Sequence, residues 1–498
     1  MRSVITDHGI GLFRKPGAAR PGYAGRQPSR CHMPRRPTAP PISWATSARP
    51  ALVHSAVLVS CENAFAVSVP TVFLMRYLEG HFAPVEVEVT AYDLPVTGRI
   101  PAELGGRYVR NGPNPMGVED PGTHVWGMGP GMVHGVRLRD GRAEWYRNRF
   151  VRVPGFAPMV HVIGHAGQAF AMAEGGLPPA LLDDELNTVG FCELGATAEG
   201  FTAGAHSKHD PHTGELHSLS YMPGREFVQY IVTDTAGAVV RAMPIAMTRT
   251  PFLHDFALTG DHVVLWDTPL GFDGFECRWL PGHPTRVGVM PRTGGEVRWH
   301  EIDPVHVSHT LNAYDDGDSV VVDLVTAQGP FDPADPGAIR PVLDRWTITT
   351  GTVQQQRIDD RPQDFPRIND AYAARPHRYG YSAATALYGI PFAPEGAASD
   401  EAFTNALVKH DFQRGIAEVH AFGAAEAVGE AVFVAIGPGE DEGYLLTYVH
   451  DPRRNAADLV VLAAQDFTGE PVARIHLPAR VPLGLHGNWL PDHRPMPA

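Results

Sequence analysis

The stretch His309-Thr310-Leu311-Asn312-Ala313-Tyr314-Asp315-Asp316-Gly317-Asp318 leads into the apolar run Ser319-Val320-Val321-Val322-Asp323-Leu324-Val325. An acidic turn followed by β-branched residues predicts a strand, with His309 held beside it by rigid backbone. A metal ligand needs such rigidity, which a loosely held loop cannot provide. The stretch therefore indicates β structure and makes His309 a candidate ligand.

Three further segments place a histidine next to a strand-like run. They are Ala205-His206-Ser207-Lys208, Phe252-Leu253-His254-Asp255-Phe256 and Gly484-Leu485-His486-Gly487-Asn488-Trp489. The four histidines are separated by 48, 55 and 177 residues along the chain. Such separations exclude a local metal finger, in which the ligands lie a few residues apart.

The composition is that of a globular, turn-rich protein. The 498 residues are 43% hydrophobic and include 52 glycines and 46 prolines, enough to bury a large core. The formal charge of −14 argues against nucleic acid as a partner, because phosphate binding needs a basic surface. Four cysteines without CxxC spacing fit a reducing, cytoplasmic setting: Cys31, Cys61, Cys192 and Cys277.

Residues 1–74 differ from the rest of the chain. They carry nine basic residues against two acidic ones, and the proline-rich stretch 35–41 predicts disorder. The apolar segment 51–74 is interrupted by polar residues and by Pro70, which disfavours a membrane anchor or a secretory signal. We expect a single domain over residues 75–498, preceded by a disordered extension or a mispredicted start.

The sequence of residues 75–498 predicts an all-β fold. Short apolar or alternating runs are separated by Gly, Pro, Asp and Asn, and sustained helical periodicity is rare. The clearest predicted strands are residues 239–246, 262–267, 296–302, 319–326, 343–349, 443–449 and 459–464.

Taken together, the histidine segments resemble the carotenoid cleavage oxygenase family. The resemblance runs in the family's order from about residue 77 to about residue 491. Four further motifs share it: Gly106-Arg107-Tyr108-Val109-Arg110-Asn111-Gly112-Pro113-Asn114-Pro115, Gly131-Met132-Val133-His134-Gly135, Trp145-Tyr146-Arg147-Asn148-Arg149 and Phe365-Pro366-Arg367-Ile368-Asn369. It implies a seven-bladed β-propeller with a cap of loops and short helices over the iron-bearing face. No internal repeat is evident, so the propeller is predicted from the resemblance rather than from periodicity.

The resemblance also implies a metal site. It assigns four ligands to Fe(II), namely His206, His254, His309 and His486. Neutral imidazole suits Fe(II), and four such ligands leave coordination positions open for O2. Carboxylates that accept the outer N–H of three of the histidines are expected at Glu174, Asp364 and Glu430. The histidines that could be mistaken for ligands are His134, His209, His217, His262 and His306.

Two departures from the family pattern stand out. Asp364 occupies a position where the family has glutamate, so we expect a backbone shift or a bridging water to restore the hydrogen bond. Pro130 replaces an acidic residue in a turn that lies near the substrate entrance in the family. Segments 152–161 and 269–286 also look short, so we expect a changed entrance.

The implied reaction is oxidative cleavage, by Fe(II) and O2, of one conjugated double bond of a carotenoid or apocarotenoid into two carbonyl products. A hydroxylated stilbene of the lignostilbene or resveratrol type is the alternative substrate, although no phenol-binding Tyr and Lys pair can be placed. A non-catalytic binding propeller is a further alternative, disfavoured because all four histidines are present. We expect an apolar polyene and O2 as partners, a cytoplasmic location and weak peripheral contact with a membrane; the oligomeric state stays open.

Overall fold

The computed structural model describes residues 78–118, 124, 127, 129–153, 159–273, 276–329, 341–384, 405–423, 426–482 and 484–492. The extension expected over residues 1–74 lies outside this part, as do Trp126 and residues 154–158 of the segments expected at the entrance.

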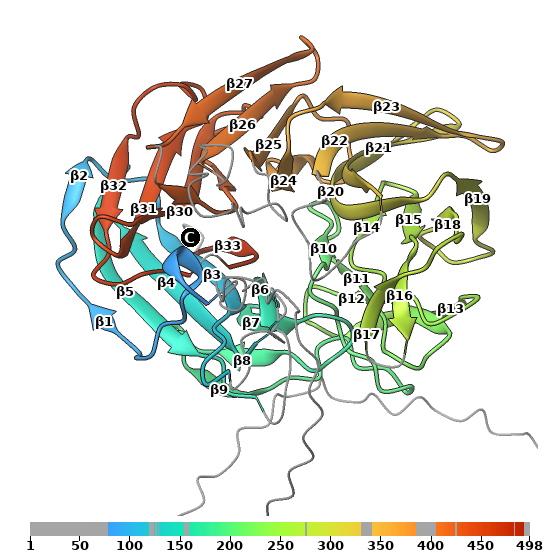
Figure 1. The fold of residues 1–498 in the computed structure, drawn as a ribbon, viewed down its shortest axis with the longest axis horizontal. Helices are drawn as coiled ribbons and strands as arrows, with labels where there is room; N and C mark the ends of the chain where they lie inside the picture. Colours follow the sequence, from blue (N-terminus) through green and yellow to red (C-terminus); the bar gives the residue numbers. More distant parts are fainter. Residues whose placement is uncertain are drawn as a thin grey trace, which may run out of the picture.

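Seven antiparallel sheets of four to six strands form a ring around a central axis in the described part of the chain (Figure 1). Each sheet runs from the axis to the rim, so that the sheets are the blades of a propeller. The predicted all-β, seven-bladed architecture is therefore confirmed.

The blades are numbered along the chain, and their strands are given from the axis outward. Blade 1 consists of β33 (Gly487–Pro491), β3 (Gly106–Pro113), β4 (Gly131–Arg139), β5 (Arg142–Phe150) and β1 (Thr90–Ala91). Blade 2 consists of β6 (Met159–His165), β7 (Gln168–Ala173), β8 (Ala180–Leu182) and β9 (Thr188–Phe191). Blade 3 consists of β10 (Lys208–His209), β11 (Leu216–Ser220), β12 (Phe227–Thr233) and β13 (Val239–Ala246).

The remaining blades follow the same plan. Blade 4 consists of β14 (Phe256–Leu258), β15 (His262–Asp267), β18 (Thr285–Pro291) and β19 (Arg298–Ile302). Blade 5 consists of β20 (Val305–Asp316), β21 (Ser319–Gln328), β22 (Pro341–Ile348) and β23 (Val353–Asp359). Blade 6 consists of β24 (Gln363–Arg367), β25 (Tyr379–Ala384), β26 (Ala406–Asp411) and β27 (Ile416–Ala421). Blade 7 consists of β28 (Ala427–Val428) and β29 (Val432–Ala435), both paired with β30 (Gly443–Asp451), then β31 (Ala456–Ala463), β32 (Ala473–His476) and β2 (Val96–Gly98).

A separate two-stranded ribbon, β16 (Leu270–Asp273) and β17 (Glu276–Trp279), leaves blade 4 within a segment that looked short for the family. The helices of the described part are two 3-10 turns, η2 (Gly80–Phe82) and η5 (Asp370–Tyr372). In that part, no helix is long and apolar enough to cross a membrane.

All seven predicted strands are confirmed. Residues 239–246 and 262–267 coincide with β13 and β15, and the other five predictions match β19, β21, β22, β30 and β31 to within three residues at each end. The β-branched run of β21 is buried almost throughout, as expected for a strand packed on both faces.

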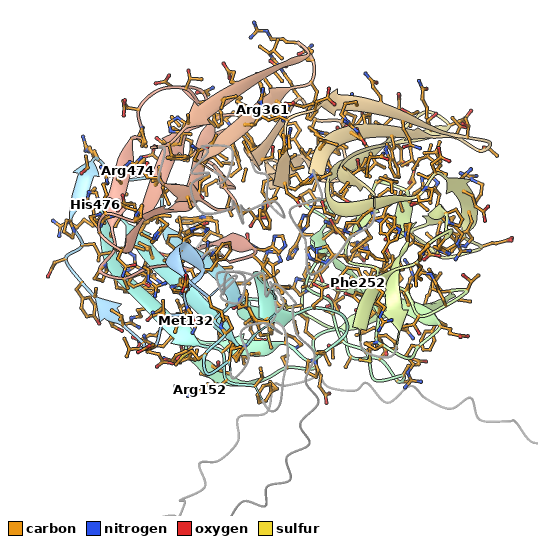
Figure 2. All side chains as sticks on the ribbon, viewed as in Figure 1. Met132, Arg152, Phe252, Arg361, Arg474 and His476 are labelled. Carbon is orange, nitrogen blue, oxygen red and sulfur yellow. The ribbon has the colours of Figure 1, made fainter. Side chains whose placement is uncertain are left out.

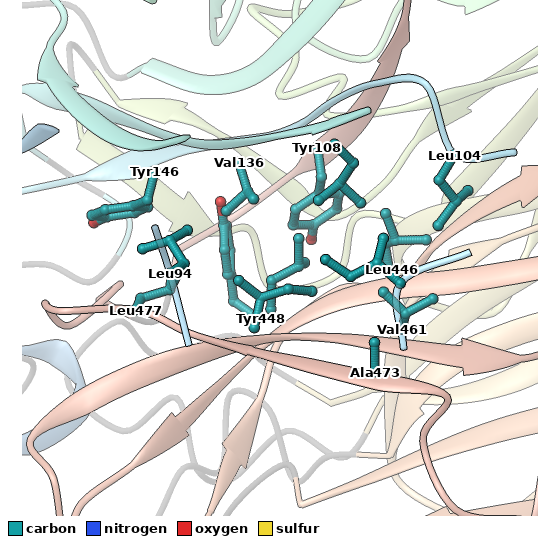
Figure 3. Packing of buried hydrophobic residues seen from close by; sticks show 14 of the residues in the cluster. Leu94, Leu104, Tyr108, Val136, Tyr146, Leu446, Tyr448, Val461, Ala473 and Leu477 are labelled. Atoms are coloured by element: carbon teal, nitrogen blue, oxygen red, sulfur yellow. The ribbon is translucent and has the colours of Figure 1, made fainter. Parts of the chain in front are cut away.

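The two ends of the propeller chain close the ring. The last strand, β33, pairs with β3 as the axial strand of blade 1, while the early strand β2 pairs with β32 at the rim of blade 7. Figure 3 shows the apolar core between these blades, where Tyr108 and Val136 of blade 1 pack against Leu446, Tyr448 and Val461 of blade 7. Burying a large apolar side chain contributes about 1.5–3 kcal/mol, so this interlocked seam stabilises the closed ring.

Candidate metal centre

Each blade contributes at least one histidine or carboxylate at or next to its axial strand. In chain order these are His161, His206, His254, His309, Asp364, Glu430 and His486. The axial strands β6, β10, β14, β20, β24 and β33 surround the centre of the ring (Figure 1). Segments far apart in sequence thereby meet at one point.

The four candidate ligands form one compact group. One nitrogen from each of His206, His254, His309 and His486 lies within 4.8 Å of the others. The Nε2 atoms of His254 and His309 are 3.2 Å apart. Two nitrogens bound side by side to one divalent metal, each at about 2.1 Å, would lie about 3 Å apart, so the spacing fits a shared ion.

His309 reaches the axis because of an irregularity in β20. The pairing of β20 with β21 shifts register on both sides of the histidine, between Val307 and His309 and between Thr310 and Asn312. Such bulges re-aim a side chain and often occur beside functional sites. His309 thus lies inside a strand of 12 residues rather than merely beside one, and the acidic turn predicted after it joins β20 to β21.

Asp255 connects three of the ligand-bearing segments. Its carboxylate, which is 1% exposed, lies 2.7 Å from Lys208 Nζ and accepts the backbone N–H of Thr310 at 2.7 Å. In the sequence, Asp255 directly follows His254 and Thr310 directly follows His309, whereas Lys208 stands two positions after His206. Burial alone would raise the pKa of Asp255, but the charge and hydrogen bond of Lys208, together with His309 and the Thr310 N–H, outweigh it, so the pKa is lowered and the carboxylate is ionised.

Two carboxylates hold the outer nitrogens of histidines directly. Asp364 Oδ1 is 2.7 Å from His309 Nδ1, and Glu430 Oε1 is 3.1 Å from His486 Nδ1. Glu430 also accepts the backbone N–H of Gly487 at 2.6 Å. Since a carboxylate only accepts, each histidine presents a proton at Nδ1 and a free lone pair at Nε2.

Glu174, which follows β7, lies near the other two candidate ligands, His206 and His254, but at longer distances. Its Oε1 is 3.5 Å from His254 Nδ1 and accepts a hydrogen bond from Tyr221 at 2.8 Å. Its Oε2 is 3.7 Å from His206 Nε2. All three carboxylates expected from the sequence thus lie beside the histidine group.

The contact between Asp364 and His309 is direct, so the hydrogen bond needs no bridging water. The strand is irregular here: β24 shifts register between Asp364 and Arg367, and Phe365 adopts a positive φ of 53°. A non-glycine residue in this region is strained, which indicates that the surroundings impose the conformation. That the backbone is shifted relative to the family stays a prediction.

The electrostatics favour the neutral form of two candidate ligands, His206 and His486. Burial lowers the pKa of both His206 and His486 well below the ordinary value, because a charged imidazole is poorly solvated there. For His309 the same burial effect is outweighed by Asp364, whose charge and hydrogen bond raise the pKa. Neutral imidazoles at these positions fit a divalent transition metal.

A cavity of about 160 Å³ adjoins the group and is lined by His206, His309 and His486. Its wall combines apolar residues such as Ile163, Leu311 and Phe365 with polar ones such as Lys208 and Arg367. The volume suffices for about five water molecules. Phe252, labelled to the right of the centre in Figure 2, stacks on His254 with ring planes 7° apart.

The alternative histidines do not join the group. Three bond a side chain elsewhere: His134 to Tyr146 at 3.0 Å, His217 to Tyr230 at 2.7 Å and His262 to Asp315 at 2.7 Å. His209 lies 3.0 Å from the carbonyl of Gly164, and His306 is buried in β20 outside the group.

The sequence did not single out His161, Asp255 or Arg367. Arg367 lies 3.8 Å from Glu430 and lines the cavity. Asp255 adjoins a candidate ligand in sequence, which could have drawn attention to it. His161 has no such marker, because one histidine in an apolar run looks like an ordinary strand residue.

The family model described as retinal pigment epithelial membrane protein matches residues 82–159 and 156–491. A carotenoid cleavage oxygenase of Mycobacterium tuberculosis is 40% identical over 497 aligned positions, covering 83% of this chain and 97% of that protein. A carotenoid 9,10(9',10')-cleavage dioxygenase of Crocus sativus is 30% identical, covering 84% of this chain and 90% of that protein.

Two solved structures share the fold. The lignostilbene dioxygenase of Pseudomonas brassicacearum has a TM-score of 0.76 at 26% identity, covering 84% of this chain and 98% of that one. A variant of the Synechocystis apocarotenoid oxygenase has a TM-score of 0.74 at 24% identity, with the same coverage.

Fold and site together define a class of metal-dependent propeller oxygenases. Within that class, this chain belongs to the carotenoid cleavage oxygenase family. The resemblance noted from the sequence is confirmed.

Proposed function

We propose that this chain is a dioxygenase that holds Fe(II) through His206, His254, His309 and His486 and cleaves one conjugated double bond of a carotenoid or apocarotenoid. Each carbon of the double bond takes one atom of O2, so the products are two carbonyl compounds. No external reductant is needed, because all four electrons that reduce O2 come from the cleaved bond. The observation that carries the proposal is the group of four imidazoles on the axis of this family's propeller.

The choice of metal rests on donor chemistry. Imidazole also suits zinc, copper and nickel, but zinc has no redox chemistry to offer O2. When bound, Fe(II) supplies a site at which O2 is activated and oriented toward the double bond. Four neutral ligands leave coordination positions free for that purpose.

The chain's own residues prepare the metal site. Asp364 and Glu430 accept hydrogen bonds from the Nδ1–H groups of His309 and His486, which fixes those rings and directs Nε2 to the centre. Asp255 and Lys208 keep the ligand-bearing segments in register. No side chain has to act as acid or base, because the reaction transfers no proton.

Similarity to a protein named lignostilbene dioxygenase keeps a hydroxylated stilbene as the second candidate substrate. The carotenoid is favoured because the relatives at 40% and 30% identity are named for carotenoid cleavage. The two candidate substrates give different products, either apocarotenoid carbonyl compounds or hydroxybenzaldehydes, so both can be tested in one vessel.

The test is a competition. Iron-loaded protein in air receives equal amounts of an apocarotenal and resveratrol in detergent, with the His309→Ala variant as control, and the products are identified by mass spectrometry. We expect shortened apocarotenoid carbonyl products from the wild type alone. Hydroxybenzaldehydes would assign the stilbene reaction instead, and the absence of both products with iron bound would overturn the proposal.

A further inference from the structure

His161 is a fifth histidine at the axis, supplied by β6 of blade 2. The residue is 8% exposed and lines the cavity that His206, His309 and His486 share. Its ring centroid lies 5.3 Å from that of His486, with the planes 59° apart. Because it is not part of the group whose nitrogens lie within 4.8 Å of one another, it neighbours the candidate ligands without being one of them.

The hydrogen bonding of His161 fixes its tautomer. Nδ1 lies 2.9 Å from the carbonyl oxygen of Ala205, and a carbonyl can only accept, so Nδ1 carries the proton. Nε2 is therefore a bare acceptor. It is buried and has no hydrogen-bond partner among the residues that the structure describes. Buried acceptors in native proteins are almost always paired with protein, water or an ion, so a donor is missing here.

His161 and its neighbour Val160 together contact the backbone of two ligand-bearing segments. Ala205, which accepts from Nδ1, directly precedes His206. On the other side, the backbone N–H of His486 donates to the carbonyl of Val160 at 2.9 Å, and Asn111 Nδ2 donates to the carbonyl of His161. The position of this one residue is thus coupled to the loops that carry His206 and His486.

We propose that His161 is a positioning residue with two separate tasks: Nδ1 anchors the loop of His206, and Nε2 would accept a hydrogen bond from a water molecule held in the shared cavity next to the metal. The inference rests on the proposed function, since it needs a metal at the four histidines. Water can donate to Nε2, whereas a diatomic molecule such as O2 or nitric oxide cannot. His161 therefore favours water over a diatomic ligand until substrate displaces that water.

The two tasks can be separated by two substitutions. His161→Asn keeps an amide N–H near the position of Nδ1 and removes the acceptor at Nε2. His161→Gln keeps an amide oxygen near the position of Nε2 and loses the donor to Ala205. His134→Asn is the control, because His134 is also buried, on β4, but bonds Tyr146 away from the axis.

Each protein is first titrated with Fe(II) in the absence of air, which gives its iron affinity. It is then titrated with nitric oxide, and the electron paramagnetic resonance signal of the iron–nitrosyl species reports how much nitric oxide has bound. We expect His161→Asn to bind iron within about twofold of the wild type and nitric oxide about tenfold more tightly, the equivalent of one lost hydrogen bond. His161→Gln should lose about tenfold in iron affinity and keep the wild-type affinity for nitric oxide. The His134→Asn control should match the wild type in both.

The outcomes distinguish the two proposals. If His161→Asn binds iron normally but nitric oxide no more tightly than the wild type, the inference about His161 is wrong. If His161→Asn and His161→Gln lose iron affinity equally, His161 has only a structural role and the inference is also wrong. A wild-type protein that binds no iron, and so gives no nitrosyl resonance, overturns the proposed function itself.

Discussion

Asp364 Oδ1 lies 2.7 Å from His309 Nδ1, although aspartate is one methylene shorter than the glutamate of the family pattern. The contact lies in an irregular part of β24, in which Phe365 takes a φ of 53° and donates its N–H to the same oxygen at 2.8 Å. The aspartate side chain therefore reaches His309 directly from this backbone.

This tight, direct contact predicts the effect of lengthening the side chain. Asp364 is 0% exposed, so Asp364→Glu must push its extra methylene against His309 or the strand. We expect about tenfold weaker iron binding, and a larger loss, up to about a hundredfold, in Asp364→Asn, where the charge is gone. Anaerobic iron titration measures both. Iron affinity at or above the wild-type level in Asp364→Glu would show that the site accepts the family residue without strain.

The pair of Lys208 and Asp255 offers a second prediction. Lys208→Met leaves the buried Asp255 carboxylate without its counter-charge, while the backbone N–H of Thr310 still binds it. Because Lys208 is 27% exposed, we expect a loss of about 2 kcal/mol, below the 3–5 kcal/mol typical of a fully buried pair.

The same variant should also lower iron occupancy, because Asp255 joins segments that carry three ligands. Thermal unfolding and iron analysis of Lys208→Met, Asp255→Asn and the double variant form a double-mutant cycle. Additive effects in that cycle would mean that the two residues act independently.

A third prediction concerns acid stability. Burial disfavours the ionised form of Asp210, but hydrogen bonds from Arg292 and from the backbone N–H of His212 outweigh it and lower the pKa from 3.8 to about 2. A carboxyl group whose pKa is lowered on folding stabilises the fold fully above its unfolded pKa, and this stability is lost as the pH falls through the folded pKa. The contribution is about 2 kcal/mol and disappears between about pH 4 and pH 2.

Asp210→Asn should therefore be less stable than the wild type by about 2 kcal/mol at pH 7, and the difference should shrink at pH 3. Urea unfolding at both pH values measures it, with the exposed Asp303→Asn as control. A difference that stays constant with pH would assign the loss to hydrogen-bond geometry rather than to charge.

The sequence predicted the strands well wherever β-branched residues repeat, as in β13, β15 and β21. It also indicated the four histidines, since each stands in a recognisable motif beside a strand. These features are local, so a short window of sequence contains them.

Features that depend on long-range pairing could not be predicted. The bulge that aims His309 inward becomes visible only when β20 is paired with β21. The contacts of Asp255 join Lys208 and Thr310, which are distant in sequence and belong to different blades. Likewise, the closure of the ring by β2 and β33 requires knowing which strands end up adjacent.

The most direct test of the account is the iron content and apocarotenal cleavage of single alanine variants at the four histidines. We predict about one iron per chain in the wild type and in the controls His134→Ala and His262→Ala. Each of His206→Ala, His254→Ala, His309→Ala and His486→Ala should retain the folded propeller by circular dichroism but lose iron and cleavage together. Full iron content and activity in any of these four variants would contradict the account.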